Sequence, residues 1–235
     1  MELFKTKEGS MEQGKKGVLL NAAWGAWYPQ GTDRLVRSAI YHGWEHDILT
    51  FKNETINEYF NPQQPYTIKA AALYEALIRG YTHVLWMDCS CWFVDNPNKL
   101  MNIIDGENGL FIKSGYNLAQ TSADSDLRWA GTDRDGAEEF DEVWSCMFGI
   151  DFTSERGKLF VDKFIGATRH GVFGTSREHN GASSDPRFLH ARQDQTAASW
   201  AYHYAGFKNL REPSELLEYA SVRTNENACV LMRGM

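Results

Sequence analysis

The sequence predicts an α/β fold in which a central, mostly parallel sheet is flanked by helices. Two segments, 17–23 and 83–87, are apolar almost throughout, which is typical of strands buried on both faces of a parallel sheet. Between them, apolar residues recur at helical spacing near 32–43 and 67–79. The chain has 235 residues, 43% of them hydrophobic, so it can bury a substantial core and is not a disordered protein.

Five elements are expected in order over the first part of the chain. The strand 17–23 is followed by a helix that Thr32 caps, and then by a short strand at 47–51. A polar stretch leads to a helix at 67–79, which a glycine ends, and the strand 83–87 comes directly after it. Strands that alternate with helices in this way favour parallel pairing through right-handed crossovers.

The second half is expected to be less regular. Strands are predicted at 109–113 and 143–148, and helices at 154–168 and 194–205. The segment 116–142 is polar and strongly acidic, and we expect a long loop there, which in a compact domain is usually functional or mobile. No segment repeats at a fixed period, so repeat architectures such as solenoids and propellers are excluded.

Composition and charge exclude several classes of protein. The net charge is −7, whereas nonspecific nucleic-acid and anionic-membrane binders are usually basic, so nucleic acid is a disfavoured partner. No apolar run approaches the roughly 18 residues that span a bilayer, and we expect no integral membrane segment. The charged start of the sequence has no apolar block behind it, which predicts no secretory signal and a cytoplasmic location. Glycine-rich phosphate loops of the dinucleotide or Walker type do not occur.

The cysteines are expected to be buried, reduced thiols. They are Cys89, Cys91, Cys146 and Cys229. A zinc site at Cys89 and Cys91 is the alternative, but no further Cys or His lies nearby at ligand spacing. Packing in a reducing compartment is therefore the favoured interpretation.

The most informative segment is 84–97, where a buried apolar strand ends on Asp88 and a short apolar run leads to Asp95-Asn96-Pro97. In open α/β sheets, ligands bind outside the carboxyl ends of the strands. A carboxylate at that place can hold a divalent ion against a diphosphate, because both offer hard oxygen ligands. The alternative is that Asp88 caps a turn or pairs with a nearby arginine.

Three segments in this order resemble the GT-A glycosyltransferases. The run 66–97 resembles their nucleotide-binding half, in which a strand ends in an Asp-X-Asp motif that binds the donor diphosphate through Mn²⁺ or Mg²⁺. The segment 146–151, Cys-Met-Phe-Gly-Ile-Asp, resembles the strand and glycine beside the donor sugar. The segment 189–199 is similar to the His-Arg-X-Asp-Gln start of a helix in several such enzymes.

The resemblance covers roughly residues 17–207. It implies one GT-A-like domain at 17–235, with a flexible lead-in at 1–16. The nucleotide-binding half would be 17–100 and the acceptor half 101–235. The residues that the resemblance places at the nucleotide-sugar are Ala23, Trp24, Lys69, Asp88, Ser90 and Gly149. Among these, Lys69 has an exposed place on its helix as the alternative, and the loop aromatics have a place in the core.

The sequence departs from the family at the metal site. Ser90 stands where the motif has its second acidic residue, and no histidine follows His203, although the family often has a metal-binding histidine there. The cofactor that the resemblance implies is Mn²⁺ or Mg²⁺, with Asp88 as its protein ligand. Fewer anionic ligands mean a lower affinity for a hard cation, so we expect the ion to be held weakly and mainly by the nucleotide's own phosphates.

Two residues of the third segment are candidates for catalysis. Asp194 is a candidate general base, because an acceptor hydroxyl must lose its proton as it attacks the donor sugar. At a helix start it is equally suited to be an ordinary N-cap. Arg192 is a candidate to offset the charge that develops on the leaving diphosphate, with a solvated surface position as the alternative.

The activity implied by the resemblance is that of a hexosyltransferase-like glycosyltransferase. It would transfer a sugar from a nucleotide-diphospho-sugar, with a UDP-sugar favoured, to a hydroxyl of a glycan or other acceptor. Trp129 and the segment 179–187 are the expected acceptor contacts, because sugar faces stack on aromatic rings. The missing second acid favours the alternative, a catalytically silent nucleotide-sugar-binding protein with the same fold.

Overall fold

A six-stranded sheet forms the centre of the protein. The structure is a computed structural model that describes residues 14–174 and 183–233. In spatial order the strands are β2 (Asp47–Lys52), β1 (Gly17–Ala23), β3 (His83–Met87), β6 (Asp141–Asp151), β5 (Gly109–Asn117) and β7 (Leu210–Arg211). β6 is antiparallel to both of its neighbours and every other pair is parallel, which confirms the predicted mostly parallel sheet.

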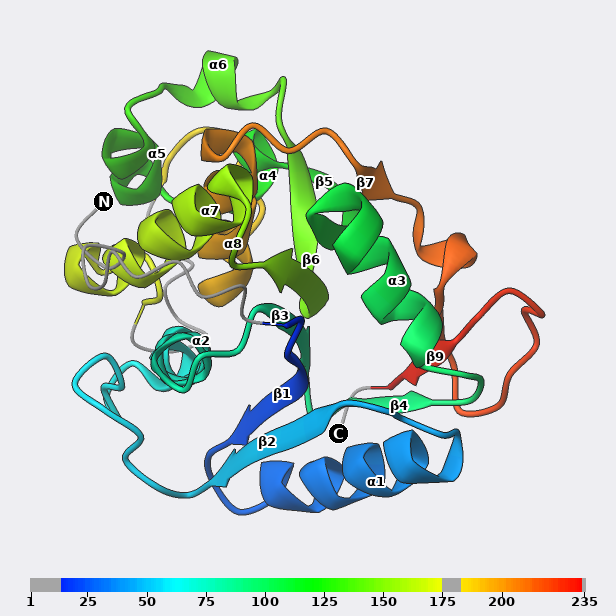
Figure 1. Ribbon diagram of the computed structural model, residues 1–235. Helices are drawn as coiled ribbons and strands as arrows, with labels where there is room; N and C mark the ends of the chain where they lie inside the picture. The colour runs from blue at the N-terminus through cyan, green and yellow to red at the C-terminus, as the bar shows by residue number, and fades with distance from the viewer. Residues whose placement is uncertain (1–13, 175–182, 234–235) are drawn as a thin grey trace.

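Helices cover both faces of this sheet (Figure 1). The longer helices are α1 (Tyr28–Tyr41), α2 (Ile68–Ile78), α3 (Asn98–Glu107), α7 (Glu155–Gly166) and α8 (Asp194–Tyr204). Apolar side chains of α2, α7 and α8 pack with one face of the sheet, and those of α1 and α3 pack with the other. β3 contributes side chains to the apolar core on each face of the sheet, because Val84 and Trp86 point to one face and Leu85 and Met87 to the other. The continuously apolar strand therefore has the buried central place that its composition predicts.

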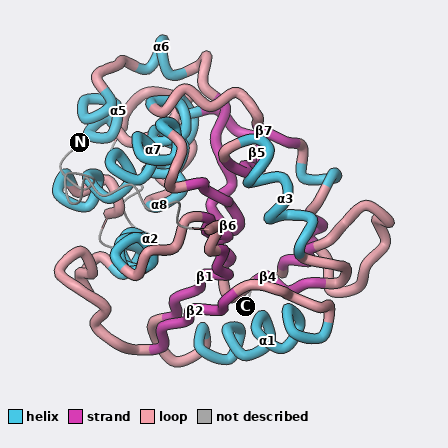
Figure 2. Tube along the Cα trace, in the orientation of Figure 1, coloured by secondary structure: helices cyan, strands magenta, loops and turns pink. Residues whose placement is uncertain are grey.

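A small second sheet ties the end of the described chain to the loop after β3. Its strands, in spatial order, are β4 (Cys91–Phe93), β9 (Val230–Met232) and β8 (Leu217–Tyr219). Figure 2 shows these short strands beside the main row of strands, close to α3. Leu217 and Val230 pack in the same apolar cluster as Phe93, so this sheet extends the core on the side of α1 and α3.

The acidic segment between β5 and β6 is not the long loop that was predicted. It contains the short helices α4 (Leu118–Thr121), α5 (Asp124–Ala130) and α6 (Arg134–Ala137). Further 3₁₀ turns are η1 (Pro65–Thr67), η2 (Ala167–His170) and η4 (Pro213–Glu215). The Asn117 side chain accepts a bond from the Gln120 amide and the Gln120 side chain accepts one from the Asn117 amide, so a capping box starts α4. Helices of this length are too short for a periodic pattern to predict them.

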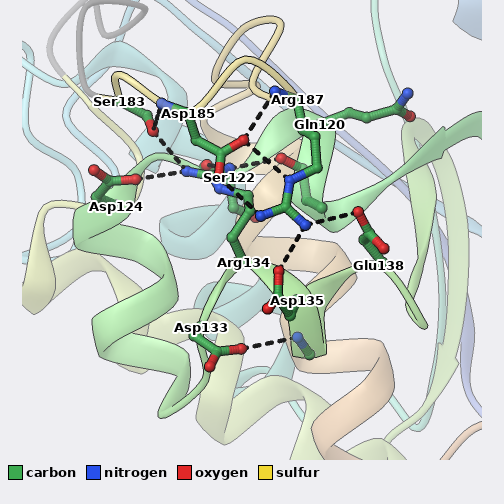
Figure 3. Close-up of polar contacts among 12 residues, drawn as sticks. Gln120, Ser122, Asp124, Asp133, Arg134, Asp135, Glu138, Ser183, Asp185 and Arg187 are labelled. Atoms are coloured by element: carbon green, nitrogen blue, oxygen red, sulfur yellow. Dashed lines mark hydrogen bonds and ion pairs between the residues drawn. The ribbon is translucent and has the colours of Figure 1, made fainter.

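Two arginines join this helical segment to the chain that leads toward α8 (Figure 3). Arg134 is buried, and it donates to the carbonyl oxygens of Ala119 and Ser122 at 2.6 and 2.7 Å and to the hydroxyl of Ser183 at 3.0 Å. It also pairs with Asp124 at 2.6 Å. Arg187 meets three carboxylates, listed by distance as Asp135 at 2.7 Å, Glu138 at 2.8 Å and Asp185 at 2.9 Å.

The elements of the first half lie close to their predicted places. β1 and β3 match the predicted strands residue for residue. α1 begins at Tyr28, before the predicted cap at Thr32, because Pro29 suits the first turn of a helix. Thr32 is instead buried inside the helix, and its hydroxyl donates to Asn21 Oδ1 at 2.6 Å. The predicted lead-in at 1–16 falls almost entirely outside the described residues.

The pairing brings three strand segments to one edge of the sheet. β1 and β3 are parallel, so Ala23 and Met87 both end there. β6 runs the other way, so its first half lies at the same edge, and the Asp88 amide donates to the Cys146 carbonyl at 2.7 Å. No helix within the described ranges is long and apolar enough to cross a membrane.

Candidate active site at the strand ends

A cavity of about 530 Å³ opens at this edge of the sheet. Six of the residues that the sequence predicts for the donor or for catalysis line it: Ala23, Trp24, Lys69, Asp88, Ser90 and Asp194. They come from the end of β1, from α2, from the loop after β3 and from the start of α8. A concave site at the carboxyl ends of parallel strands is where α/β proteins bind ligands.

Lys69 lies at the centre of the polar groups of this cavity. Its Nζ is 2.9 Å from Asp88 Oδ1 and 2.5 Å from Asp194 Oδ2. It also donates to the Ser145 carbonyl oxygen at 2.8 Å. The Ser145 hydroxyl completes the group by donating to Asp194 Oδ2 at 2.7 Å. We call Lys69, Asp88, Asp194 and Ser145 the lysine cluster.

The lysine cluster is buried but opens toward the cavity at Asp88. The Lys69 side chain is 6% exposed, so the alternative of an exposed helix position is wrong, whereas that of Asp88 is 32% exposed. Burial alone would lower the pKa of Lys69, but the charges of Asp194 and then Asp88 raise it above its usual value. Burial raises the pKa of Asp88, although the charge of Lys69 opposes the shift. Asp88 Oδ1 also accepts from the Trp86 indole at 2.9 Å, so the contacts with Lys69 and Trp86 both fall on the same carboxylate oxygen.

Asp88 is held in place by α1. Asn21, buried in β1, donates to the Met87 carbonyl at 2.7 Å, and Arg34 of α1 donates to the Cys89 carbonyl at 3.1 Å. A Cβ atom at Gly31 would come within 2.2 Å of the Cys89 carbonyl oxygen, so only glycine lets α1 approach the loop this closely. The loop that carries Asp88 and Ser90 is therefore rigidly seated.

Asp194 reaches the lysine cluster because α8 takes the place of β3 beside β6. β3 ends at Met87, whereas β6 continues past it. Gln193, the residue before α8, has φ 47° and ψ −111°, a backbone conformation that a side chain makes costly by about 1–3 kcal/mol. Asp194 does not act as an N-cap, because its carboxylate turns to Lys69 and Ser145. The strained turn and the uncapped helix both serve to place this carboxylate in the cavity.

Aromatic side chains form one wall of the cavity. Trp24 and Tyr28 line it, and the Trp24 ring packs edge-on against Phe60 at 4.8 Å between centroids. Trp27 is 71% exposed outside it. Trp24 therefore contacts the core and also faces the cavity, and its contact with a nucleotide stays a prediction.

Two predicted site residues do not line the cavity. The Arg192 guanidinium lies over the Tyr116 ring, 5.7 Å from its centroid. Gly149 is in the interior of β6, where a Cβ would come within 2.2 Å of Ile104 Cδ1. Close packing of α3 on the sheet, rather than a place in this cavity, accounts for the glycine.

Ser145 and Trp86 complete the site and were not predicted. Ser145 is a buried polar residue in a strand that is otherwise mostly apolar over 143–148, and a buried polar group needs a partner. That interruption was the available signal. Trp86 has the sequence context of an ordinary core residue, and nothing in the apolar strand 83–87 indicates that its indole donates to Asp88.

The groups that the described residues place around this cavity do not fit a resident divalent ion. Within 14–174 and 183–233, no three His, Cys, Asp or Glu side chains come together as a metal site. Of the two carboxylates in the cavity, each gives one oxygen to Lys69. The four cysteines are buried free thiols, as expected. The expectation of an ion carried mainly by nucleotide phosphates stays a prediction.

Two solved structures are similar to this chain. A glycosyltransferase involved in the glycosylation of the major capsid of PBCV-1 is 13% identical, with 92% of each chain covered and a TM-score of 0.48. The bifunctional glycosyltransferase WbbM, in its apo form, is 9% identical with a TM-score of 0.52. The match covers 95% of this chain and 46% of the WbbM chain. Neither a family model nor a curated protein sequence matches. The likeness to WbbM shows a shared fold, so the predicted glycosyltransferase fold is confirmed.

Proposed function

We propose that this protein is a glycosyltransferase that moves a sugar from a nucleotide-diphospho-sugar, with a UDP-sugar favoured, to a hydroxyl of a glycan or other acceptor. One observation carries the proposal: Lys69, Asp88 and Asp194, from three separate elements, converge in one cavity at the strand ends. The shared fold with WbbM supports it, and a hexosyl group is the sugar that the sequence resemblance favours.

Each group of the cavity has a place in this proposal. Trp24 meets the nucleotide base, and Asp88, with Ser90 beside it, would hold the donor diphosphate or the divalent ion that its phosphates carry. The acceptor oxygen attacks the anomeric carbon, the bond from that carbon to the diphosphate oxygen breaks, and the nucleoside diphosphate leaves. Asp194 takes the proton that the acceptor loses. Lys69 keeps the two carboxylates together and reduces their charge, and we assign no step to Arg192.

The test combines donor binding with turnover. UDP, GDP and UDP-hexoses are titrated by calorimetry with and without Mn²⁺, and release of nucleoside diphosphate is then measured with simple glycosides as acceptors. Asp88→Ala should weaken donor binding and abolish turnover. Asp194→Asn should keep donor binding and lower turnover at least about 100-fold, the usual contribution of a general base. Asp105→Asn is the matched control, since that carboxylate pairs with Lys15 near the opposite end of β3.

The second candidate is a catalytically silent protein that binds a nucleotide-sugar. It is favoured by Ser90, which gives the loop after β3 a hydroxyl in place of a second carboxylate. Binding of UDP without release from any donor would support this candidate, whereas absence of any nucleotide binding would contradict both. Mn²⁺ alone should bind weakly and should gain affinity once UDP is present, because the phosphates supply the missing oxygen ligands.

A further inference from the structure

Two side chains of α8 bind the edge of β6 that β3 leaves open. Ser199 Oγ accepts a bond from the Val143 amide at 2.9 Å, and Gln195 Oε1 accepts one from the Ser145 amide at 3.3 Å. Four residues of a helix rise about 6 Å, close to the roughly 6.7 Å that separate alternate residues of a strand. One turn of α8 is therefore in register with two alternate amides of β6.

The Gln195 side chain is held at both ends of its amide. Its Nε2 donates to Glu142 Oε2 at 2.8 Å, and the same carboxylate oxygen accepts from the Ser114 hydroxyl at 2.5 Å. Glu142 is fully buried. Burial raises the pKa of this carboxyl, although the Ser114 bond and the Arg192 charge oppose the shift. Burying a carboxylate costs desolvation free energy, so the use of one to hold Gln195 indicates that the position of this glutamine matters.

Ser145 links this anchored glutamine to the lysine cluster. Its amide is fixed by Gln195, its carbonyl oxygen accepts from Lys69, and its hydroxyl donates to Asp194. We infer that Gln195, anchored by Glu142, is a positioning residue that sets the placement of Asp194 and Lys69 through Ser145. This inference rests on the proposed function for its effect on turnover, but the geometry that it describes is independent of activity.

Gln195→Ala and Ser199→Ala form a matched pair of variants. Both remove buried bonds between α8 and β6: Ser199→Ala removes the bond to the Val143 amide, and Gln195→Ala removes those to the Ser145 amide and to Glu142. Only Gln195 bonds the residue that contacts Asp194. We expect Gln195→Ala to lower kcat about 10- to 100-fold, the effect of a small misplacement of a reacting group, while the KM for the donor stays within about twofold. Ser199→Ala should keep kcat within about threefold. Glu142→Gln, which still offers an oxygen to Gln195, should rescue most of the activity that Glu142→Ala loses.

Hydrogen exchange measured by NMR supplies a readout that needs no activity. In Gln195→Ala, the Ser145 amide and the Lys69 ammonium should both exchange at least about tenfold faster. In Ser199→Ala, the Val143 amide should exchange faster while the Lys69 ammonium keeps its protection. Equal effects of the two variants on Lys69 and on kcat would overturn the inference. If the wild-type protein bound no nucleotide, the proposed function would fail, and the exchange experiment would still decide the role of Gln195.

Discussion

In two of the regions that the structure describes, a basic side chain meets two or more carboxylates, and these two regions differ mainly in burial. In the lysine cluster the side chains of Lys69 and Asp194 are 6% and 8% exposed. In the second region, at α6 and the chain before α8, the Arg187 side chain is 37% exposed and that of Asp135 is 84% exposed. Both regions use ion pairs shorter than 3 Å, so distance alone does not separate them.

This difference in burial determines how much each set of ion pairs contributes to the stability of the fold. Exposed pairs contribute little, because water and salt screen them and long side chains lose entropy. A buried pair is costly to form and strongly destabilising to break, because one partner remains as an uncompensated charge. Burying Lys69 between two carboxylates at a cavity therefore costs desolvation free energy, and a contribution to stability alone does not explain why the fold keeps this arrangement. Arg134 lies between these cases, since it is buried while its partner Asp124 is 48% exposed.

Removing the buried ammonium should have the largest effect. Lys69→Met keeps most of the side-chain volume but leaves Asp88 and Asp194 unpaired against each other. We expect the free energy of unfolding in urea at pH 7 to fall by about 3 kcal/mol. Lys15→Met, which breaks the exposed pair with Asp105, is the control and should have an effect close to zero. Equal effects of the two variants would remove the distinction between the two kinds of region.

Replacing Arg134 should have an intermediate effect. Its guanidinium is the donor for the carbonyl oxygens of Ala119 and Ser122, so Arg134→Met leaves both oxygens without that partner. We expect a loss of about 2 kcal/mol in urea unfolding, because a buried polar group without a partner costs about 1–3 kcal/mol. Asp124→Asn tests the exposed half of the same pair and should cost much less. A larger loss for Asp124→Asn would mean that the ion pair, not the carbonyl contacts, holds this region.

The same contrast separates what the sequence could predict from what it could not. β1, β3 and α8 follow from local patterns, and the end of the apolar strand 83–87 indicated Asp88. The resemblance to the GT-A family indicated Lys69 and Asp194. The contact between Lys69 and Asp194 depends on β6 lying antiparallel beside β3, which no local pattern specifies. For the same reason Ser145, in the middle of β6, was missed.

The helices of the acidic segment could not be predicted for a different reason. α4 and α6 have four residues each, and tertiary contacts such as those of Arg134 hold them in place. Their residues alone resemble a solvated loop. At Gly149 the sequence indicated a site where the structure shows packing. Its neighbours in the sequence resemble those of a donor site, whereas in the structure the close approach of Ile104 explains why this residue is a glycine.

A pH titration of stability should detect the buried carboxyl of Glu142. Because burial raises its pKa, the native state holds this proton more tightly than the unfolded state does. Stability is therefore lost as pH rises from about 4.3, the ordinary value for glutamate, through the raised native pKa. Glu142→Gln removes this titration, so its stability relative to wild type should improve between pH 4 and pH 7. Glu139→Gln, at an exposed position, is the control for loss of one charge. An unchanged difference across this range would show that Glu142 does not contribute.

Arg187→Ala should have the smallest effect, and that effect should depend on salt. Arg187 touches three carboxylates, but its region faces water, and charges in water are screened within about 10 Å at 0.1 M salt.

The Arg187 side chain also makes this effect depend on pH, because it lowers the pKa of Asp185 to about 2, chiefly through their hydrogen bonds. The stabilisation is thus present above the ordinary aspartate pKa near 3.9 and is lost as pH falls toward 2. We expect Arg187→Ala to have a slightly lower Tm than wild type at pH 7 and 20 mM salt, and a smaller difference at 0.5 M salt or at pH 2.5. Arg187→Lys keeps the charge but lacks the planar guanidinium, so its Tm should lie between those of wild type and Arg187→Ala. A salt-independent loss as large as that of Arg134→Met would instead place Arg187 among the buried contacts that hold the chain leading to Asp194.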